Sequence, residues 1–384
     1  MRLLHTSDWH LGRSFHREDL LGAQASFVDF LIETVRAERV DAVLVSGDVY
    51  DRALPAVDAV ALCNEALRRL AATGTRVVLI SGNHDSAQRL GFGADLIDAA
   101  GIHLRTDARR CGEPVMLDDA HGPVAVYGLP YLEPDAVRLD LGCAERSHRA
   151  VLDAAMSAVR LDLSSRPTTR SVVLAHAFVT GGRVSDSERD ISVGGASAVP
   201  AAVFTGVDYA ALGHLHGPQA LGERVRYSGS PLAYSFSEEH HRKSVLLVDI
   251  GQRPDAPVSV TPLPTPVPRP LRRLSGRLDD LLSAAKWEAF TGHYLQVTLT
   301  DPLRPREPME RLRARFPHVL VLGFAPERSE SHPHSSYAAR LRGRDDVEVA
   351  ADFVGHVRQA PATAAETALL AEAFEAVRCA EASV

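Results

Sequence analysis

The chain has 384 residues, of which 45% are hydrophobic and 24% are charged, and its formal net charge is −7. This composition is typical of a globular protein of two or three domains. The negative charge argues against a protein that grips nucleic acid with its whole surface, because such affinity comes from neutralising phosphates. There is no apolar run of membrane-spanning length and no signal-peptide pattern, and the four scattered cysteines are typical of reduced thiols. We therefore expect a cytoplasmic protein that does not enter a membrane.

Apolar, β-branched runs alternate with helical patterns through the first 130 residues. We expect strands at 3–4, 42–45, 77–80 and 124–127, and helices at 20–36, 55–70 and 86–99. Such alternation predicts βαβ units. The next segments are richer in strands, which we expect at 172–174, 209–212, 226–227 and 245–250. The pattern predicts an α/β fold in which two packed sheets are flanked by helices, a four-layer αββα sandwich.

A proline-rich stretch, PLPTPVPRP at 262–270, predicts an extended connector between domains. We expect a first domain at 1–262 and a small α+β domain at 271–327. The helices of that second domain are expected at 278–285 and 307–316, and its strands at 294–299 and 319–322. The polar tract 328–345 is expected to be loose, and 346–384 is predicted to form a pair of amphipathic helices.

Polar residues of the kind that bind metals follow the expected strands at five places. These are Asp8-Trp9-His10, Gly47-Asp48 with Asp51 three residues on, Gly82-Asn83-His84-Asp85, His176 at the end of SVVLAH, and Gly213-His214-Leu215-His216. The carboxyl ends of strands in open α/β sheets are where sites are assembled. The i, i+2 spacing of two of these motifs sends both side chains to the same side of an extended backbone.

Each motif alone has a structural explanation. An Asp-X-His pair arises by chance, a single histidine after a strand is often a hydrogen-bonded structural residue, and Gly-Asn-His-Asp can form a turn. All five together, in order and each ending a strand, are hard to explain without a metal, because burying so many polar groups without partners is costly. The sequence therefore predicts a metal site.

The order DxH, GD, GNH[DE], H and GHxH resembles the pattern of the calcineurin-like metallophosphoesterase superfamily. Outside these motifs, LHTSDWHLGR, SDSERDISVGG and YSGSPLAYSFSE resemble the bacterial SbcD family of nuclease subunits, as do the small domain and the helical tail. The resemblance covers essentially the whole chain. It implies the αββα sandwich that the pattern also predicts, with 271–327 as a DNA-capping domain.

The resemblance implies two metal sites that share one carboxylate. One metal would take Asp8, His10, Asp48 and His216, and the other would take Asp48, Asn83, His176 and His214. The family implies two Mn²⁺ ions, with Mg²⁺ a poorer substitute, and nitrogen and oxygen ligands without thiolate suit manganese. Such a pair of ions would lower the pKa of a water molecule that attacks phosphorus in line.

His84 is not needed as a ligand, and its expected role is to protonate or stabilise the leaving sugar oxygen. Asp51 and Asp85 are both candidates for orienting His84 and holding it protonated. Asp51 is favoured because related phosphatases place their orienting aspartate three residues after the bridging one. Asp85 has the alternative role of capping a helix that begins near Ser86.

Four arginines lie near the ligand motifs and are candidates for contacts with DNA phosphates: Arg13, Arg17, Arg52 and Arg89. The alternative for each is an ordinary surface arginine. The segment GDVYDR at 47–52 also matches the GDxxDR of protein Ser/Thr phosphatases, where the arginine clamps phosphate.

The resemblance implies a homodimeric nuclease that acts on DNA together with the SMC-like ATPase SbcC. It implies 3′-to-5′ exonuclease action on duplex ends and endonuclease action on single strands and hairpins, in DNA repair, recombination and replication at the nucleoid. The helices at 56–70 and 86–99 would form the dimer contact, or else an ordinary core-facing stripe. The helical pair at 346–384 would dock on SbcC, or else form a self-packed hairpin.

Two other functions compete with this one. A phosphoprotein phosphatase or small-molecule phosphodiesterase would use the same metals, but the cap and tail argue against it. A scaffold on an inactive phosphoesterase fold would not need the complete ligand set or His84. ATP dependence would come from the partner, because the chain has no GxxxxGK[ST] motif.

Overall fold

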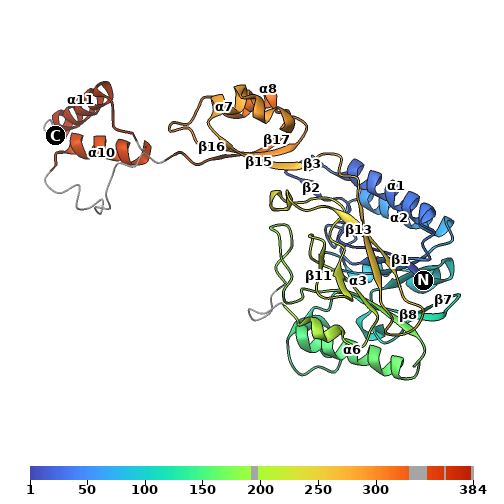
Figure 1. The fold of residues 1–384 in the computed structure, drawn as a ribbon. Coiled ribbons are helices and arrows are strands. Elements are labelled where there is room, and N and C mark those ends of the chain that lie inside the picture. Colours follow the sequence, from blue (N-terminus) through green and yellow to red (C-terminus); the bar gives the residue numbers. More distant parts are fainter. Residues whose placement is uncertain (192–197, 328–343, 359, 382–384) are drawn as a thin grey trace. The chain divides into compact units, whose positions relative to one another are not determined.

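The described residues of the computed structural model are 1–191, 198–327, 344–358 and 360–381. They form two separately packed units, Met1–Leu271 and Arg272–Val384. Figure 1 shows the first unit as a layered arrangement of helices and sheets, and the second as a small sheet with helices followed by two further helices. Each unit is described by itself.

The first sheet of the larger unit has six strands in the order β14-β13-β1-β4-β5-β6. Their bounds are β1 Arg2–Thr6, β4 Ala42–Ser46, β5 Arg76–Ile80, β6 Ile102–Arg105, β13 Ser244–Asp249 and β14 Ser259–Pro264. Strands β1, β4, β5 and β6 run parallel, and β13 and β14 are antiparallel to their neighbours. Pro262 and Pro264 lie in the edge strand β14, where a missing N–H group costs least. The expectation that the whole stretch 262–270 is a free connector is therefore wrong for its first three residues.

The second sheet also has six strands, in the order β11-β12-β10-β9-β8-β7. Their bounds are β7 Val115–Asp119, β8 Gly122–Leu129, β9 Arg170–His176, β10 Tyr209–Gly213, β11 Gln219–Ala220 and β12 Val225–Tyr227. Strands β8, β9, β10 and β12 are parallel, and β7 and β11 pair antiparallel with their neighbours at the two edges.

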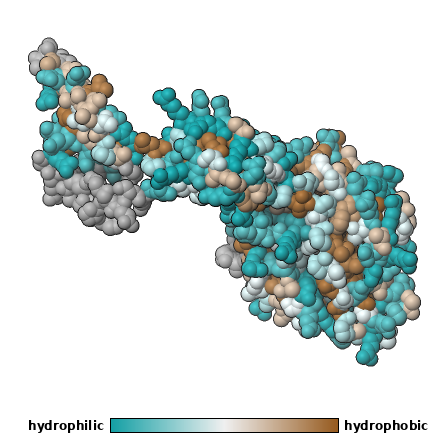
Figure 2. Space-filling view, turned by 45° about the horizontal axis from the view of Figure 1, so that its top comes forward, coloured by the Kyte–Doolittle hydropathy of each residue, from teal (hydrophilic) through white to brown (hydrophobic). Residues whose placement is uncertain are grey.

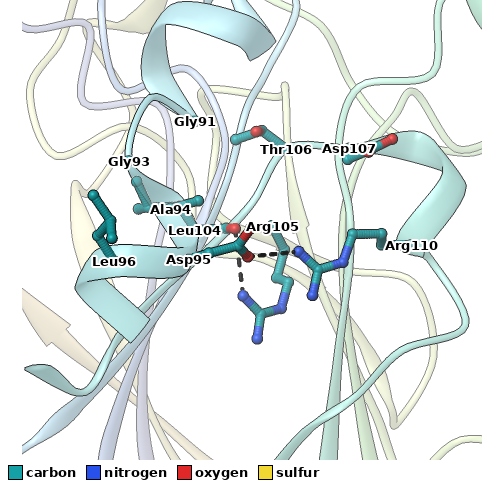
Figure 3. A pocket seen from close by; sticks show the side chains of 10 residues that line it. All are labelled: Gly91, Gly93, Ala94, Asp95, Leu96, Leu104, Arg105, Thr106, Asp107 and Arg110. Atoms are coloured by element: carbon teal, nitrogen blue, oxygen red, sulfur yellow. Dashed lines mark hydrogen bonds and ion pairs between the residues drawn. The ribbon is translucent and has the colours of Figure 1, made fainter. Parts of the chain in front are cut away.

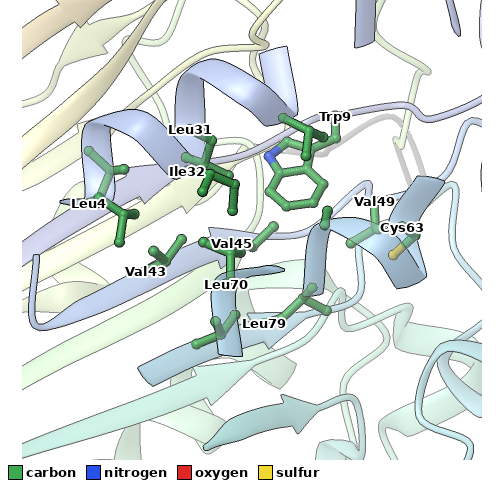
Figure 4. Close-up of a cluster of buried hydrophobic side chains, with 14 of the residues drawn as sticks. Leu4, Trp9, Leu31, Ile32, Val43, Val45, Val49, Cys63, Leu70 and Leu79 are labelled. Carbon is green, nitrogen blue, oxygen red and sulfur yellow. The ribbon is translucent and has the colours of Figure 1, made fainter. Parts of the chain in front are cut away.

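Alternation of side chains along the strands builds the four layers. In β4, Val43 and Val45 belong to the core beneath α1 (Leu21–Ala37) and α2 (Val57–Ala72), whereas Leu44 belongs to the core between the two sheets. Figure 4 shows Leu31 and Ile32 of α1 packed near Val43 and Val45. Helix α6 (His148–Ser164) covers the outer face of the second sheet. The predicted αββα sandwich is confirmed.

The prediction of a single helix at 86–99 is wrong. The chain forms two short helices, α3 (Ala87–Leu90) and α4 (Ala94–Ile97), because Gly93 between them has a left-handed backbone with φ of 74°. The remaining short elements of this unit are β2 Ser14–Phe15, β3 Glu18–Asp19, α5 Pro134–Val137 and the 3₁₀ turns at 98–100, 108–110, 201–204 and 236–238.

The second unit contains a three-stranded sheet in the order β15-β16-β17. Its elements are β15 Leu271–Gly276, α7 Leu278–Ser283, a 3₁₀ turn at 285–290, β16 Tyr294–Leu299, α8 Pro308–Arg315 and β17 Val319–Phe324. Leu281, Val297 and Phe316 are among its fully buried residues. The small α+β domain is therefore present, with β15 as a strand that the sequence pattern did not predict.

Two helices, α10 (Asp346–Arg358) and α11 (Ala364–Glu381), follow and are joined by an ion pair of 2.6 Å between Arg358 and Glu366. Most of the polar tract predicted to be loose, 328–343, lies outside the described residues. Apolar side chains reach the surface of the chain among hydrophilic ones (Figure 2). None of the helices in the described ranges has the length and apolar character needed to cross a bilayer.

Candidate metal centre

Five parallel strands end at the predicted ligands. Strands β1, β4 and β5 lead into the motifs of Asp8, Asp48 and Asn83, and β9 and β10 lead into those of His176 and His214. Two buried contacts join the sheets beside these ends: Ser46 Oγ donates to the carbonyl of Ala211 at 2.8 Å, and His176 Nδ1 lies 2.9 Å from the carbonyl oxygen of Ser46. The two sheets therefore bring ligand motifs that are distant in sequence to one place.

The backbone at this place is strained. Asp8, His10, Asp48 and His214 all have positive φ, at 53°, 46°, 48° and 103°. Left-handed backbone costs about 1–3 kcal/mol at a residue other than glycine, and it clusters at functional sites. Gly47, with φ of 88°, is required for a second reason, because a Cβ atom there would collide with the imidazole of His176.

One group of donor atoms comes from Asp8, His10 and His216, and these atoms all lie within 4.8 Å of one another. The Nε2 atoms of His10 and His216 are 3.0 Å apart. His10 Nδ1 is buried and has no hydrogen-bond partner among the described residues. The carboxylate of Asp8 is held by Ser7 Oγ, which donates to it at 2.6 Å, and by the backbone N–H of His214 at 3.0 Å. Two imidazole nitrogens and a fixed carboxylate thus face a common point.

The second group includes Asp48, Asn83, His176 and His214. Asp48 Oδ2 lies 3.5 Å from His176 Nε2 and 3.6 Å from His10 Nε2, so this one oxygen faces both groups. Asn83 Oδ1 lies 2.9 Å from His176 Nε2 and 3.2 Å from His214 Nδ1. The backbone N–H of His84 donates to Asp48 Oδ1 at 2.8 Å, which fixes the shared carboxylate.

The charges of these residues match divalent cations. Burial lowers the pKa of His10, His176 and His214, which keeps each imidazole in the neutral form that binds metals. Burial and then the neighbouring Asp48 raise the pKa of Asp8, because its ionised form has no counter-charge. Two buried carboxylates side by side are costly without cations, and the amide of Asn83 adds a ligand without adding charge. The donor set therefore fits two divalent metal ions.

His84 is 8% exposed and borders this cluster, because a ring nitrogen of His84, a ring nitrogen of His10 and a carboxylate oxygen of Asp48 all lie within 4.8 Å of one another. Its Nδ1 atom is 2.7 Å from the backbone carbonyl oxygen of Asp51, so the orienting contact comes from the main chain of Asp51 and not from its carboxylate as expected. The carboxylate of Asp51 instead lies 3.8 Å from His10 Nδ1 and 3.6 Å from Arg13 Nε.

The expectation that Asp85 caps a helix is wrong, since Ser86 is the N-cap and accepts from the backbone N–H of Arg89. Asp85 accepts backbone N–H groups from Val49 at 3.1 Å, Tyr50 at 2.9 Å and Gly82 at 2.9 Å. Its carboxylate therefore ties the loop of Asp48 to the loop of Asn83 and His84.

The four candidate arginines have different surroundings. The guanidinium of Arg13 lies 5.0 Å from the ring centroid of Tyr234 and donates to the carbonyl of Ser187 at 3.1 Å. Its other terminal nitrogen, Nη1, has no hydrogen-bond partner in the described part of the chain. Arg89 donates to the carbonyl of Ala53 at 2.9 Å. Arg52 is 70% exposed and lies 3.6 Å from Asp51, and Arg17 is exposed in the turn between β2 and β3.

A cavity of about 460 Å³ lies beside α4 and β6 and is lined by Asp95, Arg105 and Arg110 among others (Figure 3). None of its lining residues is a predicted ligand. Its charged groups neutralise one another or their neighbours, because Arg110 pairs with Asp95 at 3.0 Å and Arg105 pairs with Asp98 at 3.0 Å. The cavity is therefore separate from the metal centre.

Sequence reasoning missed a layer of polar residues behind His216, of which Ser187, Glu238 and Lys243 are buried and Glu188 is partly exposed. They come from SDSERDISVGG and YSGSPLAYSFSE and from the turn that follows the second motif. These motifs carry the family resemblance but contain none of the ligand patterns. The recurrence of acidic residues beside serine in both motifs was the available signal.

Two family models match the chain. The model of the calcineurin-like phosphoesterase family matches residues 1–218, and the SbcD_C model, described as the type 5 capsule protein repressor C-terminal domain, matches residues 267–357. Similar solved structures include the protein TT1561 of Thermus thermophilus, with 12% identity and a TM-score of 0.40 over 68% of this chain and 98% of that chain. A dimetal phosphatase from Danio rerio has 12% identity and a TM-score of 0.38 over 68% of this chain and 98% of that chain. GAP50, the anchor in the inner membrane complex of Plasmodium, has 10% identity and a TM-score of 0.37 over 86% of this chain and 99% of that chain.

The phosphoesterase match covers more than half of the 384 residues and contains every predicted ligand. The second match covers the small α+β domain and most of α10. The chain belongs to the calcineurin-like phosphoesterase family of two-metal hydrolases, in the arrangement that carries an SbcD-type C-terminal domain.

Proposed function

We propose that this protein is the nuclease subunit of an SbcCD-type complex, and that it hydrolyses DNA phosphodiester bonds with two Mn²⁺ ions. The observation that carries the proposal is the presence, on one chain, of a phosphoesterase domain with clustered metal-binding side chains and an SbcD-type C-terminal domain. We propose that it acts as a 3′-to-5′ exonuclease on duplex ends and as an endonuclease on single strands and hairpins. Its place would be DNA repair, recombination and replication at the nucleoid.

The proposed ligands are Asp8, His10, Asp48 and His216 for one ion and Asp48, Asn83, His176 and His214 for the other. Bound there, the ions supply a lowered pKa for an attacking water and positive charge for the phosphate oxygens. Asp48 presents a single oxygen to both groups and thereby sets their spacing. Mg²⁺ would be a poorer substitute, because the four histidine nitrogens suit a softer ion.

The proposed catalytic acid is His84. Because its Nδ1 atom is engaged by the carbonyl of Asp51, Nε2 is the atom that can exchange a proton with substrate. From that atom, His84 would give a proton to the leaving sugar oxygen. Asp51 contributes through its main chain, and its carboxylate positions Arg13 beside His10.

Local positive charge is needed to hold DNA, because the chain as a whole carries −7. The buried Nη1 atom of Arg13 lacks a hydrogen-bond partner within the described ranges and is the proposed contact for an oxygen of the scissile phosphate. Arg17, Arg52 and Arg89 are proposed to contact the DNA backbone further away. The domain of β15–β17 is proposed to cap the DNA.

Two surfaces are proposed for partners. Leu54, Val57, Phe92 and Leu96 are 68%, 82%, 87% and 84% exposed, and we propose that these apolar residues of the segments around α2 and α3–α4 form the homodimer contact. On the tail, Phe353 and Val357 of α10 and Leu369 and Val377 of α11 are all more than half exposed. We propose that this face docks on the coiled-coil base of an SbcC-type ATPase.

One set of assays tests the proposal. Purified protein with Mn²⁺ is given duplex DNA, hairpin DNA and a phosphopeptide, with and without the ATPase partner. The Asp48→Asn variant is the control that removes the shared ligand. We expect DNA cleavage by the wild type and none by the variant. Release of phosphate from the peptide alone would support the phosphatase alternative, and no reaction with any substrate in the presence of the partner would support the scaffold alternative.

A further inference from the structure

A chain of buried polar contacts lies behind His216. His216 Nδ1 is 2.6 Å from Ser187 Oγ, and the same Ser187 Oγ is 2.6 Å from Glu238 Oε1. His216, Ser187 and Glu238 are 1%, 7% and 1% exposed. Lys243, also buried, forms an ion pair with the other carboxylate oxygen of Glu238 and donates to the carbonyl of His216 at 2.9 Å. Water therefore does not compete for these contacts.

The direction of the hydrogen bonds follows from the charges. Glu238 is paired with the ammonium of Lys243 and is therefore a carboxylate that can only accept. The single proton of the Ser187 hydroxyl goes to this charged acceptor, because charge-assisted bonds are the stronger ones. The neighbouring Ser185 is 2.8 Å from Ser187 but has its own carboxylate acceptor, Glu188, at 2.7 Å. Ser187 Oγ is thus left to accept from His216, so Nδ1 carries the imidazole proton.

We propose that Ser187, Glu238 and Lys243 are positioning residues that lock His216 as its Nδ1–H tautomer and so present the lone pair of Nε2 to a metal ion. The inference rests on the proposed role of His216 as a ligand. His10, which faces His216 across 3.0 Å, has no such lock, since its Nδ1 atom lacks a hydrogen-bond partner in the described part of the protein. His216 is therefore the pre-organised ligand of this pair.

The network also joins two segments that sequence alone leaves without a role. The backbone N–H of His216 donates to Glu188 at 2.8 Å, and the backbone N–H of Asp186 donates to Ser237 Oγ at 2.9 Å. The segment 185–188 is thereby held against the turn 235–238 and against the loop of His216. An orienting partner behind a metal-binding histidine fixes its tautomer and ring orientation, and its loss typically weakens metal binding by about 10- to 100-fold.

The test combines two measurements on the full chain. In metal-free protein with ¹⁵N-labelled histidine, long-range ¹H–¹⁵N NMR identifies the protonated nitrogen of His216, whose signals are assigned by their absence in His216→Gln. Mn²⁺ affinity is then measured by calorimetry. The variants are Ser187→Ala, Ser187→Thr, which keeps a hydroxyl, and Ser157→Ala on the exposed face of α6 as a control.

We expect Nδ1–H in the wild type, a mixture of tautomers and Mn²⁺ binding weakened about 10- to 100-fold in Ser187→Ala, and recovery in Ser187→Thr. An Nε2–H tautomer in the wild type would overturn the inference, even if Ser187→Ala does not fold. Unchanged tautomer and affinity in a folded Ser187→Ala would also overturn it, while leaving the nuclease proposal intact. If the wild type binds no Mn²⁺, the proposed metal centre is wrong. The tautomer of His216 in metal-free protein would still show whether the network fixes the proton on Nδ1.

Discussion

The Nδ1 atom of His84 lies 2.7 Å from the backbone carbonyl oxygen of Asp51, and this contact engages one of the two ring nitrogens of His84. We expect His84→Gln to bind Mn²⁺ with wild-type stoichiometry but to cleave DNA about 10²- to 10⁴-fold more slowly, since only proton transfer is lost. Calorimetry and single-turnover cleavage measure the two effects. His240→Gln, at a histidine that is 76% exposed, is the control expected to change neither. Loss of a metal ion in His84→Gln would show that His84 is a ligand.

Gly47 lies so close to the imidazole of His176 that a methyl group added at Gly47 is expected to lower both the stability of the protein and its affinity for Mn²⁺. We expect Gly47→Ala to destabilise the protein by about 1–3 kcal/mol and to weaken Mn²⁺ binding, because the new Cβ atom displaces the imidazole. Gly74 is the matched control: its φ of 81° is similar to the 88° of Gly47, but a Cβ atom there would meet nothing within 4 Å. Gly74→Ala should cost only the backbone strain and leave Mn²⁺ binding unchanged. Equal losses of stability and affinity in the two variants would contradict the packing of His176 on Gly47.

The ion pair between Asp119 and Arg170 leads to a prediction of how the stability of the first unit changes in acid. Arg170, which is 1% exposed, donates to both carboxylate oxygens at 2.6 and 3.0 Å and holds the pKa of Asp119 well below its usual range. A depressed folded-state pKa gives stability that is fully present above the unfolded value of about 3.9 and is lost as pH falls through the folded value. We therefore expect Asp119→Asn to be less stable than wild type by on the order of 2–3 kcal/mol at pH 7, because the buried guanidinium of Arg170 loses its counter-charge. That difference should narrow below about pH 4.

Urea unfolding followed by the fluorescence of Trp9, in a Trp287→Phe background, measures this difference in the first unit alone. Asp118→Asn on the exposed face of the same strand is the control, and it should match wild type at every pH. A gap between Asp119→Asn and wild type that widens in acid would reverse the predicted sign.

The exposed apolar side chain of Leu96 predicts the site of self-association. If α4 contributes to a homodimer, Leu96→Glu should give a monomer, because a charge buried in an apolar contact is not compensated. Leu161→Glu on α6 is the matched control, since Leu161 is 75% exposed against 84% for Leu96. Light scattering on the two variants and the wild type measures their masses. Monomers for both variants, or a dimer that survives Leu96→Glu, would place the contact elsewhere.

The sequence predicts the sandwich and the strand-end clustering of candidate ligands because both follow local patterns. Leu44 alternates with Val43 and Val45 in a buried run, and each candidate ligand motif directly follows such a run. Parallel strands present their carboxyl ends at one edge, so the motifs that follow the strands of one sheet are expected to lie near one another. The contact between Asp8 of the first sheet and the backbone N–H of His214 of the second is seen only in the structure.

The features that sequence reasoning missed depend on tertiary context. Ser187 and Glu238 are 51 residues apart in the sequence, and no periodic pattern predicts the hydrogen bond between them. The helix expected at 86–99 breaks at Gly93, whose left-handed φ outweighs the helical spacing of the residues around it. Pro262 and Pro264 are tolerated in β14 only because this strand lies at a sheet edge, which cannot be known before the sheet order is known.

Diffraction from Mn²⁺-soaked crystals at the manganese absorption edge tests the central claim most directly. Two anomalous peaks are expected roughly 3.5–4 Å apart, one on each side of Asp48 Oδ2, with His10 and His216 at the first and His176 and His214 at the second. In Asp48→Asn crystals, both peaks should lose occupancy. A Mn²⁺-soaked crystal of the folded protein that shows no ion between these histidines would contradict the two-metal centre and the proposed nuclease activity that depends on it.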